Sequence, residues 1–219
     1  MDIEPETKTE TAPRPQRKPL ALVNARLIDP ASSLDAFGGL LIANGTIADL
    51  GMHITEGSIE GADTLDCGGR TVAPGLIDMM VSCGEPGHEH RETLATASAA
   101  AAAGGVTTIC CMPNTDPVID DVALVDFILR RARDTALVNV HPIVAMTRGL
   151  KGEELAELGL LRDAGAIAFS NGKTSVSNSR LMRNVLSYAK DCDALIVHHL
   201  EEGNLAEGGV MNEGEVATR

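Results

Sequence analysis

The spacing of hydrophobic and polar positions changes near residue 71. Before it, the apolar residues form four short runs that are typical of strands: 20–29, 40–43, 46–50 and 64–67. Two of these runs flank Asn44 and Gly45, and both residues tolerate the positive φ angles of a tight hairpin turn. Residues 19–70 therefore predict a small β unit.

After residue 71, short apolar runs alternate with longer segments of helical spacing. The expected strands are 76–81, 106–112, 138–146, 166–170 and 194–198, and the expected helices are 91–103, one that begins after Asp120 or Asp121, 152–163 and 179–190. This alternation predicts an α/β fold with a parallel sheet and right-handed crossovers. The run 76–81 is interrupted only by Asp78, which is typical of a parallel strand covered on both faces.

The helical segments carry apolar stripes and end signals. The first is rich in Ala, the strongest helix former, and Gly104-Gly105 ends it. In the other three helices the residues expected to face inward are Val125, Ile128, Leu129, Ala132, Leu155, Leu158, Leu161, Leu181, Val185 and Tyr188. These stripes predict helices that pack on one side against the sheet.

The composition of the chain argues against several classes of function. The chain has 219 residues, enough to bury a core, and its 18 basic and 31 acidic residues give a net charge of -13. An excess of acidic residues argues against binding to nucleic acid or to an anionic membrane surface. No apolar run approaches the roughly 20 residues that cross a bilayer, and no signal peptide is visible. Residues 1–18 have almost nothing to bury and predict a disordered tail.

The number and spacing of the cysteines indicate the cellular compartment of the protein. The chain has five, at positions 67, 83, 110, 111 and 192, an odd number without paired-motif spacing. This pattern favours reduced thiols in a cytoplasmic protein. Cys83, Cys110 and Cys111 are expected to act as small buried hydrophobic residues.

Two motifs carry a resemblance to a known family. Pro-Gly-Leu-Ile-Asp-Met at 74–79 is followed by Glu-Pro-Gly at 85–87, and Cys-Met-Pro-Asn-Thr occupies 111–115. From about residue 20 onward the chain resembles the dihydroorotases of the amidohydrolase superfamily. The resemblance implies a TIM barrel, which needs eight strand–helix units in about 250 residues. It also implies that residues 19–70 are one part of a β-sandwich whose remainder follows the barrel.

Only part of such a barrel is present. Four complete units and a fifth strand can be counted, so 71–219 is expected to form a partial TIM (β/α) barrel of four to five units of eight, preceded by the small β-sandwich segment. Two interpretations stay open. The chain is a fragment of a longer protein, or its open half-barrel is covered by another copy or by a partner.

The resemblance also implies a metal site that this sequence has altered. The family places a His-x-His zinc pair at 80 and 82, a substrate-binding Arg at 84 and a bridging Asp at 171. Here these positions hold Met80, Ser82, Gly84 and Asn171. A thioether and a hydroxyl do not replace imidazole on Zn²⁺. His199 matches a family metal position after the fifth strand and is the ligand that remains.

Each remaining candidate has a structural alternative. Asn114 matches a substrate-contacting Asn of the family, or it only holds the loop between two prolines. His199 is a remaining ligand, or it only makes a hydrogen bond inside the old pocket. His198 faces the other way and is expected to be structural. His88 and His90 also have His-x-His spacing, but they lie in a loop rather than in the strand.

Two functional hypotheses follow from the resemblance. The first is a non-catalytic dihydroorotase-like protein of pyrimidine biosynthesis, without catalytic residues or cofactor, that associates with aspartate transcarbamoylase or with itself. The alternative is a metal-dependent cyclic amidohydrolase that interconverts carbamoyl-aspartate and dihydroorotate. It would use zinc held by His88, His90, His199 and residues from a missing half. A third possibility is a truncation product without a role of its own.

Overall fold

The chain divides into two compact units between Pro74 and Gly75. The computed structural model describes residues 18–212 and 214–217. The expected tail, 1–18, therefore lies outside the described residues except for Lys18.

The first unit ends with β5 (Thr71–Val72), which pairs in parallel with β1. These two residues belong to the β unit, although we expected the barrel half to begin at residue 71.

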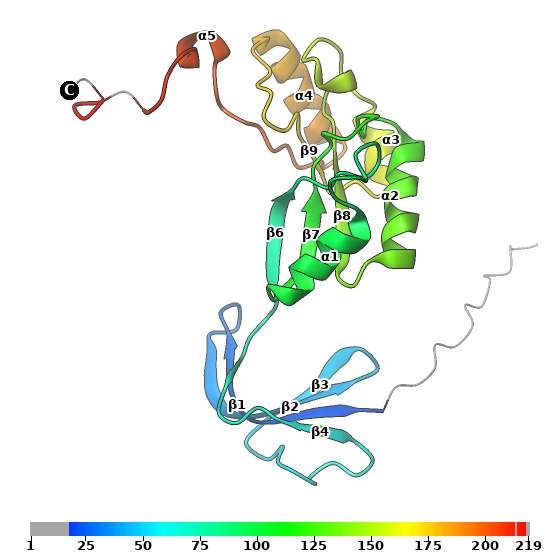
Figure 1. Ribbon diagram of the computed structural model, residues 1–219, viewed down its shortest axis with the longest axis vertical. Helices are drawn as coiled ribbons and strands as arrows, with labels where there is room; N and C mark the ends of the chain where they lie inside the picture. The colour runs from blue at the N-terminus through cyan, green and yellow to red at the C-terminus, as the bar shows by residue number, and fades with distance from the viewer. Residues whose placement is uncertain (1–17, 213, 218–219) are drawn as a thin grey trace, which may run out of the picture. The chain divides into compact units, whose positions relative to one another are not determined.

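The first unit is a five-stranded sheet. Its other strands are β1 (Leu20–Asp29), β2 (Leu34–Ala43), β3 (Thr46–Gly51) and β4 (Asp63–Asp66), in the order β3-β2-β1-β4. β1, β2 and β3 pair antiparallel, while β4 runs parallel to β1 (Figure 1). The predicted hairpin turn is confirmed, because Asn44 and Gly45 have φ angles of 53° and 79°.

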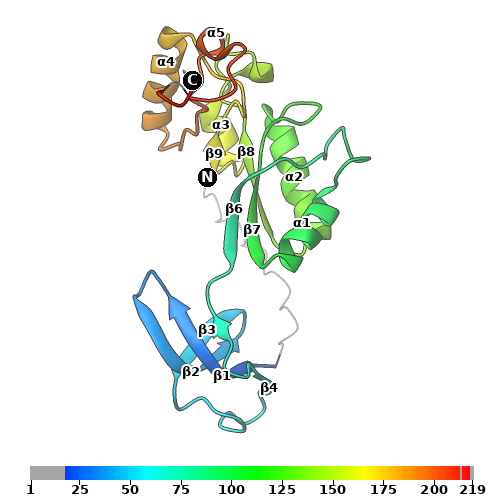
Figure 2. The ribbon, with the colours of Figure 1, turned by 60° about the vertical axis from the view of Figure 1, so that its left-hand side comes forward.

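The second unit is a mixed α/β body built on a parallel sheet. Its strands are β6 (Leu76–Val81), β7 (Val106–Cys111), β8 (Asn139–Val144) and β9 (Ala168–Phe169), in the order β6-β7-β8-β9. Its helices are α1 (Leu94–Ala103), α2 (Val122–Thr135), the short 3₁₀ helix Arg148–Leu150, α3 (Leu158–Asp163), α4 (Ser179–Asp191) and α5 (Gly203–Ala206). The sheet curls as half of a barrel, with α1, α2 and α3 along one side of it (Figures 1 and 2). The predicted α/β class and partial TIM barrel are confirmed.

The sheet of the second unit has two differently packed faces, as strand alternation requires. On the outer face, Ile109, Cys111 and Val144 belong to the large core that also contains helix residues such as Val125 and Ile128. The inner face carries a smaller cluster of Cys110, Met112, Ile143 and Ala168, against which Val197 packs. Of the predicted inward positions of α2, Val125, Ile128 and Ala132 are buried, and Leu129 is partly buried against the same core.

Polar side chains fix where the helices begin. Asp121 caps α2 by accepting a hydrogen bond from the Ala123 N–H at 2.8 Å, which selects between the two Asp residues considered above. Thr93 and Thr96 form a reciprocal capping box at α1. α1 therefore begins at Leu94, later than the expected residue 91, because the segment before it turns back through the hydrogen bond from Arg91 N–H to the His88 carbonyl.

The expectation that residues 76–81 are covered on both faces is wrong for this structure. Ile77, Met79 and Met80 are 63%, 70% and 59% exposed. The reason is the place of β6 at the edge of the sheet, where β7 is its one strand neighbour in the described chain. The apolar sequence is thus typical of a buried strand, whereas the described residues cover only part of β6.

The second half of the unit is less regular than expected. Of the predicted helix 152–163, only Leu158–Asp163 is helical, because Gly152 has a φ of 70° and Thr147 pairs with Leu155 in an isolated bridge. The predicted strand 194–198 forms a single bridge, Ile196 to Phe169, rather than a full strand. On α4 the buried positions are Leu181, Val185 and Ala189, whereas Tyr188 is exposed, which corrects its predicted inward position.

Candidate functional site

The candidate site is the set of loops that follow the carboxyl ends of the strands, where barrel enzymes hold their chemistry. Met80 and Ser82, at the end of β6, are both exposed, and the Met80 N–H donates to Asp78 Oδ1 at 3.0 Å. Burial raises the pKa of the Cys110 thiol on the inner face, and the Asp78 carboxylate adds to the rise. A thioether and a hydroxyl thus stand where the family resemblance implies imidazoles.

The loop after β6 is folded tightly around Gly84. An ideal Cβ at this position would lie 2.5 Å from the His88 carbonyl oxygen and 2.6 Å from the Glu92 carbonyl oxygen. Both distances are far below the roughly 3.5–4.0 Å of favourable non-bonded contacts. The His88 N–H also donates to the Gly84 carbonyl at 2.6 Å. This loop conformation therefore accepts glycine and no side chain at the position where the resemblance implies Arg.

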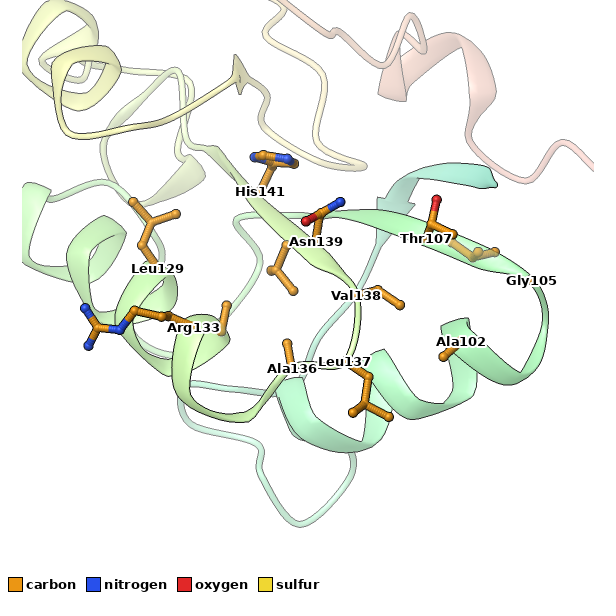
Figure 3. A pocket seen from close by; sticks show the side chains of 13 residues that line it. Ala102, Gly105, Thr107, Leu129, Arg133, Ala136, Leu137, Val138, Asn139 and His141 are labelled. Carbon is orange, nitrogen blue, oxygen red and sulfur yellow. The ribbon is translucent and has the colours of Figure 1, made fainter. Parts of the chain in front are cut away.

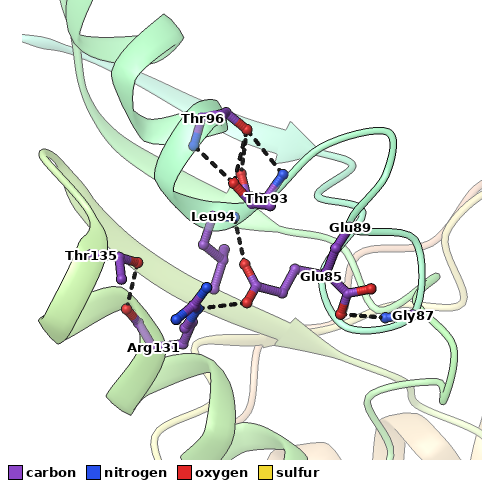
Figure 4. Close-up of polar contacts among 8 residues, drawn as sticks. All are labelled: Glu85, Gly87, Glu89, Thr93, Leu94, Thr96, Arg131 and Thr135. Atoms are coloured by element: carbon purple, nitrogen blue, oxygen red, sulfur yellow. Dashed lines mark hydrogen bonds and ion pairs between the residues drawn. The ribbon is translucent and has the colours of Figure 1, made fainter.

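A buried acid, Glu85, anchors the same loop (Figure 4). It is 3% exposed, its Oε2 accepts the Leu94 N–H at 2.9 Å, and its Oε1 accepts Nε of Arg131 at 2.6 Å. The contacts join the loop to the first turn of α1 and to α2. Leu94 is the first residue of α1, where unpaired N–H groups favour an anion. The sequence interpretation used Glu85 only as part of a motif and missed this role.

The two loop histidines do not form a metal site with the other described residues. Their rings, on His88 and His90, pack edge to face with centroids 6.0 Å apart. Across residues 18–212 and 214–217, no group of three or more His, Cys, Asp or Glu side chains is placed to hold an ion. Glu89, which lies between the two histidines in the sequence, accepts the Gly87 N–H at 2.9 Å, a hydrogen bond that lowers the pKa of its carboxyl (Figure 4).

The loop after β7 is held by Thr115 rather than by Asn114. Thr115 is buried, and its hydroxyl donates to the Pro117 carbonyl at 2.7 Å. The Ile119 N–H donates to the Pro113 carbonyl at 3.2 Å and closes the turn. Asn114 is exposed, and none of the described residues forms a hydrogen bond with its side chain. The hydrogen bonds that close this loop therefore do not involve the Asn114 side chain.

Both polar side-chain atoms of Asn171, which follows β9, form hydrogen bonds with Thr147. It is 1% exposed, its Oδ1 accepts the Thr147 N–H at 3.2 Å, and its Nδ2 donates to the Thr147 hydroxyl at 2.6 Å. The same hydroxyl accepts the Gly152 N–H at 3.0 Å. Asn171 therefore ties the loops after β8 and β9 together.

The two adjacent histidines near the end of the unit have different surroundings. His198 Nε2 accepts the Val176 N–H at 3.0 Å, and burial, with a smaller effect of His199, lowers the pKa of its ring. This matches the structural role expected for His198. The exposed His199 has its Nε2 3.2 Å from Glu201 Oε2.

These side chains do not fit the zinc that the fold family implies. A hydrolytic zinc site needs His nitrogens and carboxylate oxygens around an open water position. The strand ends instead offer the Met80 thioether, the Ser82 hydroxyl and an Asn171 amide whose two polar atoms already bond Thr147. The one imidazole at a family position, His199, pairs with Glu201.

A cavity of about 700 Å³ lies at the opposite end of the sheet (Figure 3). Thr107 and Asn139 line it near the starts of β7 and β8, together with His141 and, from the last turn of α2, Arg133. The amino ends of barrel strands usually serve stability rather than catalysis. The cavity is therefore separate from the loops that carry the candidate residues.

Comparison with known proteins gives a consistent result. Residues 69–219 match the model of the family described as dihydro-orotase-like. The chain is 46% identical over 199 residues to a dihydroorotase of Geobacter sp. (strain M21), covering 91% of this chain and 46% of that protein. It is 45% identical over 201 residues to a dihydroorotase of Solibacter usitatus, covering 92% and 46%. The chain thus spans about half the length of these curated relatives.

Solved structures support the fold. An L-hydantoinase (dihydropyrimidinase) from Arthrobacter aurescens superposes with a TM-score of 0.69 at 23% identity, covering 81% of this chain and 39% of that one. A D-hydantoinase (dihydropyrimidinase) from Thermus sp. gives 0.64 at 23%, covering 86% and 41%. No helix in the described part of the chain is long and apolar enough to span a bilayer. On the family match and the sequence identity, the chain belongs to the dihydroorotase-like family.

Proposed function

We propose that the chain is a non-catalytic dihydroorotase-like protein of pyrimidine biosynthesis, with a structural role beside aspartate transcarbamoylase. The observation that carries the proposal is the closed packing around Gly84, where a Cβ would overlap the carbonyls of His88 and Glu92. The family resemblance implies a substrate-binding Arg at this position. A loop in this form has no room for any side chain there, so the anchor for an anionic substrate is missing.

The missing Arg matters because of the charge of the substrate. Carbamoyl-aspartate and dihydroorotate carry carboxylates, and a guanidinium binds a carboxylate with two parallel charge-assisted hydrogen bonds. Asn114 stays exposed and offers a neutral amide. An amide makes weaker, uncharged hydrogen bonds, so Asn114 alone provides a contact but not an anchor.

Changes at the other strand ends support the same conclusion. Cleaving or closing a cyclic amide needs a nucleophilic water, and in the family resemblance a zinc site supplies it. Met80 and Ser82 lack the nitrogens for that site, and Asn171 is bonded to Thr147. What this chain retains is the scaffold, with a half-barrel sheet whose edge strand leaves Ile77 and Met79 exposed. Such a surface is suited to contact with another polypeptide.

The test is a binding measurement with the purified chain. We expect light scattering on a micromolar mixture with an aspartate transcarbamoylase to give a mass above that of either protein alone. The chain alone, and the chain mixed with an unrelated acidic protein, serve as controls. A mixture whose masses stay those of the separate proteins contradicts the structural role. The chain alone is also expected to leave carbamoyl-aspartate and dihydroorotate unchanged.

The alternative function is a metal-dependent cyclic amidohydrolase, and the identity of 46% to a curated dihydroorotase favours it. It requires ligands such as His88, His90 and His199, with further ones from residues outside this chain. Metal analysis after dialysis separates the two functions. Stoichiometric zinc together with hydrolysis of dihydroorotate supports the alternative, whereas a metal-free and inactive chain supports the first proposal.

A further inference from the structure

Two buried thiols meet at the strand ends. The sulfurs of Cys83 and Cys111 are 3.0 Å apart, and the residues are 4% and 1% exposed. Both were expected to be small buried hydrophobic residues, and both are buried, but that interpretation gave no reason for them to touch. The other cysteines lie elsewhere: Cys110 faces the inner cluster, Cys67 is in the first unit, and Cys192 follows α4.

The contact follows from the register of two neighbouring strands. Val81 and Cys111 are partners in the parallel pairing of β6 with β7, and the Met112 N–H donates to the Val81 carbonyl at 2.9 Å. Cys83 lies two residues beyond Val81, so the chain that leaves β6 carries it over the end of β7. Both thiols then pack into the same outer core, which also contains Leu94 and Ile119. Packing on all sides holds the two sulfurs against each other.

We propose that Cys83 and Cys111 are a site of reversible oxidation, where a disulfide bond forms between the ends of β6 and β7. A disulfide bond is about 2.05 Å long. From 3.0 Å the sulfurs need to approach by about 1 Å, which small side-chain rotations provide. Adjacent Cys110 has no such partner among the described residues, because alternation along β7 turns it to the other face of the sheet.

The pKa values of the two thiols shift in opposite directions, and the difference bears on which thiol attacks the oxidant. The hydrogen bond with Cys111 lowers the pKa of Cys83, although burial and the nearby charges of Glu92 and Glu85 oppose this. The same contact, together with burial, raises the pKa of Cys111. The thiolate is the nucleophile in thiol oxidation. The direction of these shifts favours Cys83 as the attacking thiol, and Cys111, with its sulfur 3.0 Å away, is placed to resolve the product.

Hydrogen peroxide, as the oxidant, accepts the two electrons that the two thiols lose. The Cys83 thiolate attacks one peroxide oxygen, the O–O bond breaks, and the leaving hydroxide takes a proton to become water. The sulfur of Cys111 then attacks the sulfenic acid at Cys83, the S–O bond breaks, and a second water leaves. Two thiols lose two protons and two electrons, and one peroxide becomes two waters. An added dithiol reverses the reaction by exchange.

The bond would join two loops of the candidate site. The loop after β6 contains Gly84 and Glu85, and the loop after β7 contains Asn114. In the reduced protein, packing and the Glu85 contacts hold these loops. In the oxidised protein a covalent link would hold them as well, so oxidation makes the strand ends more rigid and the chain more resistant to unfolding.

The test uses the full chain, first reduced and then treated with hydrogen peroxide. Thiols are counted after denaturation, and the expected count falls from five by two, with the intact mass lower by two hydrogens. Trypsin cuts after Arg91, so Cys83 and the Cys110-Cys111 pair fall in different peptides. Without reductant we expect those two peptides to migrate as one, and with dithiothreitol to separate.

The matched control is Cys110→Ala, adjacent to Cys111 and also buried. This variant should still lose two thiols, whereas Cys83→Ala and Cys111→Ala should not form the linked peptide. Circular dichroism checks that each variant folds, and the wild-type thiol count and peptide map test the proposal without any variant. Five thiols after peroxide, a link that disappears in Cys110→Ala, or oxygen added to Cys83 without a cross-link would each overturn it.

Discussion

The carboxylate of Glu85 accepts a hydrogen bond from the guanidinium of Arg131 at 2.6 Å, and this pair fixes the loop after β6 on two helices. Glu85 is almost fully buried, while the Arg131 side chain is 45% exposed. If the pair is broken, most of the lost stability therefore comes from leaving the buried Glu85 carboxylate without its partner. There the second carboxylate oxygen also serves the Leu94 N–H at the start of α1.

Replacing this acid should destabilise the second unit. In Glu85→Ala the Leu94 N–H loses its partner in a buried setting, and a cavity remains, so we expect a loss of about 2–3 kcal/mol in the free energy of unfolding. Urea unfolding followed by circular dichroism measures it. Glu89→Ala on the same loop is the control, because Glu89 is exposed and its carboxylate accepts the Gly87 N–H of the same loop. Equal midpoints for the two variants would contradict the anchoring role.

Adding a methyl group at Gly84 should open the loop. The Cβ of Gly84→Ala would overlap two carbonyl oxygens, so we expect about 1–3 kcal/mol of destabilisation and faster amide exchange in residues 82–93. Gly203→Ala is the control, since no heavy atom lies within 4 Å of a Cβ built there. Exchange rates that do not change in Gly84→Ala would show that the closed loop is not the solution conformation.

The two asparagines of the candidate site should respond differently. Asn171→Ala leaves the fully buried Thr147 N–H without its partner, and we expect a loss of about 1–3 kcal/mol. Asn114→Ala should leave the unfolding midpoint unchanged, because the exposed side chain makes no hydrogen bond to the described residues. A destabilised Asn114→Ala would restore the interpretation that Asn114 holds its loop.

Stability should fall as the pH drops through the range in which histidine titrates. Burial lowers the pKa of His198, so the unfolded chain binds a proton more readily than the folded chain does. The contribution of His198 is complete above the unfolded value of about 6.5 and is lost as the pH falls towards the lower folded value.

Urea midpoints between pH 7.5 and 5.5, a range of about two units around the unfolded histidine value, measure this loss. His198→Gln is the control, because its amide oxygen can accept the Val176 N–H without titrating. The lowered pKa values of Asp29, Asp35 and Asp126 act at lower pH, below their ordinary value of 3.8. The same pH dependence in both proteins would mean that His198 is not responsible.

Local signals in the sequence predicted those elements whose cause is local. The Asn44-Gly45 hairpin depends on two residues that accept positive φ, and the start of α2 depends on a cap two residues from the N–H that it accepts. Both causes are visible in a short window of sequence. The half-barrel needed more, because the motifs at 74–87 and 111–115 carried it through resemblance rather than through periodicity.

Features that depend on contacts distant in sequence were not predictable in this way. No spacing rule joins Glu85 to Arg131, because they meet only when the loop after β6 packs on α2. The same is true of Asn171 and Thr147, which meet only when two loops fold over the strand ends. The same holds for the exposure of Met80. Its apolar character indicates burial, and only the order of strands in the sheet reveals that β6 lies at an edge.

The open edge of β6 also bears on how concentrated solutions of this chain behave. Its outer row of backbone N–H and C=O groups has no strand partner in the described chain and can template pairing with another extended backbone. The charge of -13 on every copy opposes such stacking through mutual repulsion. Added salt weakens that repulsion, because the screening length shrinks from about 10 Å at 0.1 M to about 3 Å at 1 M. Low ionic strength therefore keeps the chains apart in storage.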